Sequence, residues 1–194
     1  MPSPDLRARL RAALEQAPRP EPARGDRLAA VLLPLVRRGE VRAVFTRRTE
    51  HLPRHAGEIS FPGGLADDAD PDLEATALRE LEEELGVAPE RVEVLGALPP
   101  VHTTVSGILV VPYVGMLAGD EAFLPSEEEI AEVLEFPLAA LAAAEAEVAW
   151  PVGDHVYRGF AYEMRGATIW GLTARILHEL LEILRKEAPW TIAP

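Results

Sequence analysis

The first part of the chain changes from a helical spacing of apolar residues to strand-like patterns. Three leucines spaced four apart predict an amphipathic helix over residues 5–17. The proline-rich stretch 18–22 ends that helix and forms a stiff linker. An apolar run over 28–36 and an alternating segment over 41–46 follow, and together they predict a β-hairpin.

The rest of the chain mixes helical and strand patterns. The clearest helix is Leu73–Leu85, for which Gly86 supplies a C-terminal cap. Two further helical segments are expected over 136–147, which is rich in alanine, and over 169–186. Strands are expected over 58–61, 91–98 and 108–117, with a hairpin over 155–166. This mixture predicts a layered α/β fold, with a helix and linker over 1–22 and one domain over 23–194.

Composition narrows the classes of function that the chain can have. A formal net charge of −13 argues against a nucleic-acid platform and against docking on an anionic membrane. The chain has no cysteine, so any metal must be held by oxygen or imidazole ligands. No signal peptide and no apolar run of membrane-spanning length is visible, so we expect a cytoplasmic protein. An acidic protein can still act on a phosphate compound if divalent cations bridge the two.

The predicted helix over 73–85 separates its acidic and apolar residues. Helical geometry puts Glu80, Glu83 and Glu84 on one face. It puts three leucines on another face: Leu78, Leu81 and Leu85. Carboxylates at this spacing can converge on Mg²⁺ or Mn²⁺, which prefer oxygen ligands. The alternative is a solvated acidic face, because repulsion between neighbouring carboxylates costs only a few tenths of a kcal/mol.

Residues around this helix favour the metal-binding interpretation. Gly63 and Gly64 allow the backbone to approach an ion or a ligand closely. Arg79 could orient a carboxylate through a bidentate pair, or it could be an ordinary exposed arginine. Asp70, followed by proline, is expected to cap the helix, although a supporting role at the site is equally open.

The segment "RELEEELGV" over 79–87, preceded by the glycine pair, resembles the Nudix box. One position departs from the general box, because Pro71 stands where a glutamate is usual. The spacing between the glycines and Arg79 is also one residue longer. That longer spacing, with Asp67 and Asp70, resembles the coenzyme A pyrophosphatase-like branch of the Nudix hydrolases. An upstream motif similar to that branch comprises Thr46, Arg48, Leu52, His55 and Gly57.

The resemblance implies a Nudix-type α/β/α sandwich around a mixed sheet, with a catalytic loop–helix–loop. It implies hydrolysis of the pyrophosphate of coenzyme A or acyl-coenzyme A to 4′-phosphopantetheine and adenosine 3′,5′-bisphosphate. Mg²⁺ or Mn²⁺ would be held by three side chains and one backbone carbonyl: Glu80, Glu83, Glu84 and Gly64. Arg79 would orient the glutamates. Substrate contacts would come from Arg48, His55, Gly63 and Gly64.

Several points stay open in the sequence. The general base could be a glutamate of the box or one of Glu127–Glu129. Trp170 is expected at the start of the last helix, in the core or at an interface, and a homodimer is possible. The substrate could instead be ADP-ribose, NADH or a dinucleotide. A nucleotide-sensing module without catalysis is the alternative from another class, although all three core glutamates of the box are present.

Overall fold

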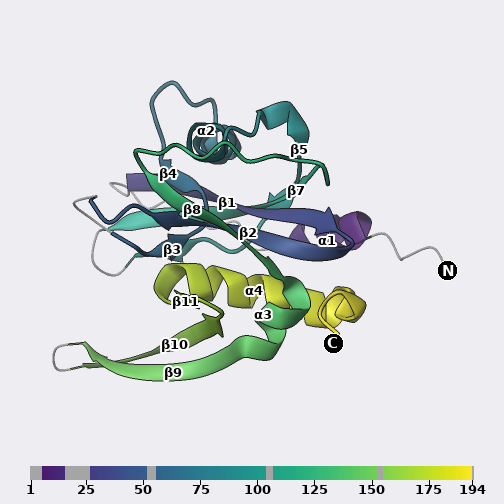
Figure 1. Ribbon diagram of the computed structural model, residues 1–194, viewed down its shortest axis with the longest axis vertical. Coiled ribbons are helices and arrows are strands. Elements are labelled where there is room, and N and C mark those ends of the chain that lie inside the picture. Colours follow the sequence, from purple (N-terminus) through teal and green to yellow (C-terminus); the bar gives the residue numbers. More distant parts are fainter. Residues whose placement is uncertain (1–5, 16–26, 52–55, 104–106, 153–154, 194) are drawn as a thin grey trace.

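The computed structural model describes residues 6–15, 27–51, 56–103, 107–152 and 155–193. Within these residues the chain forms one large mixed sheet, one small sheet and four α-helices (Figure 1). The large sheet has eight strands: β1 (Arg27–Arg38), β2 (Glu40–Arg48), β3 (Ile59–Ser60), β4 (Gly63–Leu65), β5 (Val92–Ala97), β6 (Val101–His102), β7 (Ile108–Leu117) and β8 (Ile130–Pro137).

The centre of the large sheet follows the order β3-β2-β1-β7-β5. Strands β1 and β2 form the hairpin that the sequence predicts, with Gly39 in the left-handed conformation at the turn. Strands β1 and β7 pair in parallel, and the other strand pairs of this sheet are antiparallel. Strand β4 pairs with β1 at the end where β1 begins, so the glycine pair lies beside the central strand.

Helices cover both faces of this sheet, as expected for an α/β/α sandwich. Helix α2 (Leu73–Leu85) lies on one face, and α3 (Leu138–Ala144) and α4 (Gly171–Glu187) lie on the other (Figure 1). Alternate residues of β1 supply the two cores, because successive side chains of a strand point to opposite faces. Leu32 packs in the cluster with α2, whereas Leu33 packs in the cluster with α4.

Helix α1 (Leu6–Glu15) belongs to the core on the α4 side. Its three predicted leucines are buried: Leu6, Leu10 and Leu14. Leu14 packs so closely against Gly96 of β5 that a Cβ at the glycine would clash with it. Arg11 also binds Glu93 of β5 at 2.8 Å. Helix α1 therefore shares the hydrophobic core of the domain that follows it.

The small sheet corrects two sequence predictions. It contains β9 (Glu145–Val152), β10 (His155–Met164) and β11 (Ala167–Ile169) in the order β11-β10-β9. The segment predicted as a hairpin is the single strand β10, and its neighbours on both sides complete an antiparallel sheet. The helix predicted over 136–147 is confined to α3, because residues from Glu145 onwards pair with β10. Pairing between strands overrides the helical preference of alanine there.

Two short 3₁₀-helices complete the described secondary structure, η1 (Pro89–Arg91) and η2 (Pro189–Thr191). None of the described helices is both long enough and apolar enough to cross a membrane.

Candidate active site

Helix α2 has the bounds that the sequence predicts, but its N-terminal cap is a different aspartate. Asp72, not Asp70, is the N-cap, and its side chain accepts a hydrogen bond from the backbone N–H of Ala75 at 2.8 Å. Gly86 ends the helix in the left-handed conformation, with φ at 67°. The prediction that Asp70 caps the helix is therefore wrong, and its carboxylate has another partner.

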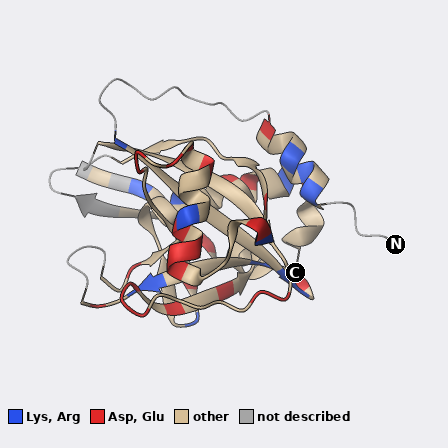
Figure 2. Ribbon diagram, turned by 90° about the horizontal axis from the view of Figure 1, so that it is seen from above, with Lys and Arg blue, Asp and Glu red and all other residues tan. Residues whose placement is uncertain are grey.

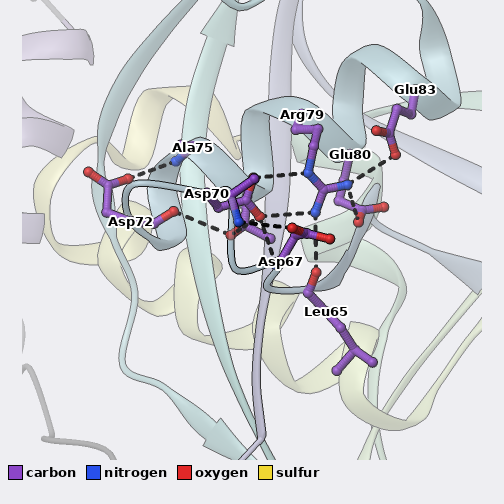
Figure 3. A network of polar contacts seen from close by, with 10 residues as sticks. Leu65, Asp67, Asp70, Asp72, Ala75, Arg79, Glu80 and Glu83 are labelled. Carbon is purple, nitrogen blue, oxygen red and sulfur yellow. Dashed lines mark hydrogen bonds and ion pairs between the residues drawn. The ribbon is translucent and has the colours of Figure 1, made fainter.

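Asp70 holds Arg79 in a bidentate pair (Figure 3). Arg79 Nε donates to Oδ1 at 3.0 Å, and Nη2 donates to Oδ2 at 3.1 Å. The Thr76 hydroxyl and the backbone N–H of Asp67 also donate to Oδ2. Hydrogen bonds from Arg79 lower the pKa of Asp70 well below its usual range, with the Asp67 N–H assisting and burial opposing. Asp70 is thus ionised and fixed at neutral pH.

The other side of the Arg79 guanidinium faces the acidic residues of α2. Its Nη1 donates to Glu80 at 2.8 Å and to Glu83 at 3.0 Å, and its Nη2 donates to the carbonyl of Leu65 at 3.2 Å. Figure 2 shows α2 from above, with its acidic residues around its single basic residue. Arg79 therefore joins the loop before α2 to two of the predicted metal ligands.

Glu84 is the buried member of the acidic set, with only 4% of its surface exposed. Its Oε1 accepts from the backbone N–H of Gly63 at 3.3 Å. Its Oε2 is buried and has no hydrogen-bond partner among the described residues. Burial raises the pKa of Glu84 to about 7, although the Gly63 N–H and the charge of Arg48 act in the opposite direction.

Gly63 and Gly64 each leave no room for a side chain, and the neighbouring atoms differ. A Cβ on Gly63 would clash with the backbone of Ala30 and with Val31 on β1. A Cβ on Gly64 would overlap the carboxylate of Glu80. Gly64 therefore lets the carboxylate of Glu80 approach the backbone of β4.

Arg48 lies at the end of β2, near the acidic face. Its Nε is buried and has no hydrogen-bond partner among the described residues. Its Nη2 lies 3.7 Å from Glu129 Oε2. Two buried polar atoms of opposite charge, on Arg48 and Glu84, are thus left without hydrogen bonds in the described part of the chain. Buried polar groups are usually paired, so such atoms mark a place where a ligand can bind.

Of the run Glu127–Glu129, Glu129 lies beside Arg48 at this site. Besides burial, its charge contributes to the raised pKa of both Glu80 and Glu84. The loop that carries it is tied to α2, because the N–H of Ser126 donates to the Glu84 carbonyl at 3.0 Å. The sequence alone offered three equivalent glutamates here, and only the path of the loop distinguishes them.

His55, the remaining predicted substrate contact, lies outside the described residues. Trp170, predicted for the core or an interface, is 48% exposed at the N-terminus of α4 and therefore is not a core residue.

The acidic face suits a hard divalent cation. The unpartnered Oε2 of Glu84 provides a buried anionic ligand, and the missing side chain of Gly64 leaves backbone beside Glu80. In the described residues, however, no three carboxylates already converge as a metal site. Arg79 occupies the position between Glu80 and Glu83, so these side chains must turn from the guanidinium to share an ion.

Comparison with known proteins identifies the family of the chain. Residues 26–158 match the NUDIX domain family. The chain is 40% identical to an uncharacterized Nudix hydrolase, NudL, from Pectobacterium atrosepticum, over 86% of this chain and 88% of that protein. It is 42% identical to a protein of the same name from Cronobacter sakazakii, over 80% and 81% of the two chains.

A solved structure of a MutT/nudix family protein from Enterococcus faecalis is 19% identical to the chain. The match covers 91% of this chain and 66% of that one, with a TM-score of 0.49. The family match spans most of the chain, and the two relatives are similar over most of their length. The chain therefore belongs to the Nudix family and is a hydrolase of the pyrophosphatase class.

Proposed function

We propose that this enzyme hydrolyses the pyrophosphate of coenzyme A or acyl-coenzyme A to 4′-phosphopantetheine and adenosine 3′,5′-bisphosphate. The single observation that carries metal-dependent hydrolysis is the buried oxygen of Glu84, which has no hydrogen-bond partner in the described part of the chain. The resemblance of the Thr46–Gly64 region to the coenzyme A pyrophosphatase-like branch supports this choice of substrate.

Nudix hydrolases use divalent metal ions, and we assign Mg²⁺ or Mn²⁺ to the acidic face. The ligands would be the carboxylates of Glu80, Glu83 and Glu84 and the carbonyl of Gly64. When bound, the ion supplies charge neutralisation for the pyrophosphate and lowers the pKa of a water molecule. In the absence of the ion Arg79 pairs with Glu80 and Glu83, which would turn from it to bind the ion, while Asp70 anchors the other side of the guanidinium.

Two side chains would act directly on the substrate. Arg48 has a buried N–H without a partner among the described residues, and a guanidinium pairs well with phosphate oxygens. Glu129 lies 3.7 Å from Arg48 and remains about half exposed to water. This placement favours Glu129 as the group that accepts a proton from the attacking water.

The test is hydrolysis by the purified enzyme with Mg²⁺ or Mn²⁺ and a panel of pyrophosphates. Coenzyme A, ADP-ribose, NADH and diadenosine compounds are supplied separately, and the products are identified by mass spectrometry. We expect the highest kcat/KM for coenzyme A or an acyl derivative, with 4′-phosphopantetheine as a product. A higher kcat/KM for ADP-ribose or a dinucleotide would reassign the substrate while leaving the pyrophosphatase chemistry intact.

A further inference from the structure

A pocket of about 370 Å³ lies between β3, β4 and the N-terminus of α4. Its apolar walls come from three parts of the chain: Val31 of β1, Phe61 after β3, and Trp170, Leu172 and Ile176 at the start of α4. The Trp170 side chain lines the pocket although the residue is 48% exposed. An exposed indole beside aliphatic side chains provides apolar area for a ligand.

This pocket is continuous with the candidate active site through two residues. Arg48 and Gly63 both line it. Gly63 also donates its backbone N–H to Glu84, and the charge of Arg48 acts on the same carboxylate. A substrate whose phosphates lie at Arg48 can therefore extend a substituent into the pocket without leaving the site.

The hydroxyl groups in the pocket walls already have partners within the protein. The Ser60 hydroxyl lies 3.2 Å from the Thr46 hydroxyl, and the Thr173 hydroxyl donates to the carbonyl of Ile59 at 3.2 Å. A nucleobase is usually recognised through hydrogen bonds to its edge, and these two hydroxyls are engaged elsewhere. The polar lining that remains is Arg48 and Glu58, and the other lining residues favour recognition by apolar contact.

Two further features suit an elongated chain with carbonyl groups. The first turn of α4 borders the pocket. N–H groups of a first helical turn have no acceptor within the helix, so they can bind ligand carbonyl oxygens. A second hollow of about 430 Å³ shares Glu58, Ile59 and Trp170 with the pocket, so the space continues beyond the indole.

We infer that this pocket binds the aliphatic, amide-containing arm of the substrate, with Trp170 as its main specificity-determining contact. On the proposed function, this arm is the pantetheine or acyl-pantetheine part of the molecule. The nucleoside then lies on the other side of the pyrophosphate. The pocket thus distinguishes substrates by the chain attached to one phosphate. The acidic face binds the pyrophosphate, which all of these substrates share.

The test compares Trp170→Ala with Trp170→Phe and with the control Trp190→Ala. Trp190 is also partly exposed, but it follows the opposite end of α4, where it packs under Arg9. Binding of 4′-phosphopantetheine and of adenosine 3′,5′-bisphosphate is measured by calorimetry, and kcat and KM for coenzyme A are measured with Mg²⁺. Each product carries only one of the two arms, so each reports on one half of the site.

For Trp170→Ala we expect roughly tenfold weaker 4′-phosphopantetheine binding and a similar rise in KM, with a smaller change in kcat. Binding of adenosine 3′,5′-bisphosphate should be unchanged, Trp170→Phe should recover most of the loss, and Trp190→Ala should match the parent. Selective loss of adenosine 3′,5′-bisphosphate binding would overturn the inference by placing the nucleoside in the pocket. Equal binding by all variants would also overturn it.

The proposed function can fail separately from this inference. If the parent enzyme binds 4′-phosphopantetheine through Trp170 but does not cleave coenzyme A, the proposed reaction is wrong and the pocket assignment holds. If the parent enzyme cleaves coenzyme A but Trp170→Ala does not weaken binding of 4′-phosphopantetheine, the reaction holds and the pocket assignment is wrong. If the parent enzyme binds no 4′-phosphopantetheine at all, the pocket assignment is overturned.

Discussion

Two glutamates on opposite sides of the main sheet, one buried and one partly buried, show how a carboxylate can serve either structure or function. Glu145, at the start of β9, receives the Tyr162 hydroxyl at 2.7 Å and Arg185 Nη2 at 2.8 Å, and its Oε2 lies 3.1 Å from His178 Nδ1. Glu84 receives one backbone N–H and keeps one buried oxygen without a partner in the described residues. Glu84 is buried and Glu145 is partly buried, with 14% of its side chain exposed, so both carboxylates lose contact with water and Glu84 loses more.

The pKa values of the two carboxylates shift in opposite directions. Burial alone would raise the pKa of Glu145, but bonds from Tyr162 and His178 and the charge of Arg185 lower it overall. Burial dominates at Glu84 and raises its pKa to about 7. The chain itself satisfies Glu145, which therefore ties β9 and β10 to α4. At Glu84 the described residues leave one acceptor open, and an external cation can satisfy it.

The largest expected effect is on catalysis by Glu84→Gln. The amide keeps the shape but loses the charge that the bound ion requires, so kcat should fall roughly 10²–10³-fold. The melting temperature should not fall, because the variant removes a buried charge that accepts only one hydrogen bond from the described residues. Glu82→Gln, at an exposed position on another face of α2, is the matched control and should retain full turnover. Near-normal turnover in a folded Glu84→Gln variant would remove Glu84 from the reaction.

Glu145→Ala should have the reverse profile. Loss of this carboxylate leaves the Tyr162 hydroxyl and Arg185 without their shared partner, which should lower the free energy of unfolding by about 2 kcal/mol. Specific activity below the melting temperature should be retained. Urea unfolding measures the difference, with Glu147→Ala, at an exposed position of β9, as control. A loss of activity without a loss of stability would contradict the structural role.

Asp70→Asn should weaken the support of the metal ligands. The variant loses the charge that holds the Nε and Nη2 side of Arg79, so the guanidinium can pair more tightly with Glu80 and Glu83. We expect the Mn²⁺ concentration for half-maximal activity to rise roughly tenfold. Asp68→Asn, at an exposed position of the same loop, is the control. An unchanged Mn²⁺ requirement would show that Asp70 stabilises the loop before α2 without supporting the metal ligands.

The smallest expected effect is on how stability depends on pH. Glu145 and Glu84 should change the free energy of unfolding of the metal-free protein in opposite directions as the pH changes. The pKa of Glu145 is lowered on folding, so its contribution to stability is present above the unfolded value of about 4.5 and is lost as pH falls below it. The pKa of Glu84 is raised, so its contribution is present below about 4.5 and is lost as pH rises towards about 7.

Variants at the two positions should therefore differ from the parent in opposite directions. At pH 6 the Glu145→Gln variant should have a lower free energy of unfolding than the parent, and this difference should shrink as the pH is lowered to 3. The free energy of unfolding of Glu84→Gln should rise relative to that of the parent as the pH is raised from 4.5 to 7. Parallel pH profiles for the two variants would mean that the two carboxylates do not differ as described.

The sequence predicts the α2 side of the molecule better than the α4 side. The bounds of α2 were predicted because the leucine spacing, the Gly86 cap and the acidic face all agree. The strand β9 was missed because it follows directly on an alanine-rich helix, and only its pairing with β10 defines it. Strand β8 was missed because its glutamates interrupt the apolar pattern, although it pairs along most of β2.

Within the site, local patterns identified residues but not their partners. The acidic face and the glycine pair follow from helical and backbone geometry, which act over a few residues. The ion pair between Arg79 and Asp70 was not predicted, because Asp70 fitted the sequence pattern of a helix N-cap equally well. Glu129 and Trp170 reach the site only through the fold, since one lies far beyond α2 and the other at the start of α4.

The most direct test is a crystal structure of the enzyme grown with Mn²⁺ at neutral pH, with anomalous scattering used to locate the ion. We predict an ion about 2.1–2.3 Å from the open oxygen of Glu84 and from a carboxylate oxygen of Glu80, with Glu83 turned away from Arg79. Under saturating Mn²⁺, an acidic face without an ion and an unchanged Arg79–Glu83 pair would contradict the assignment of this face as the metal site.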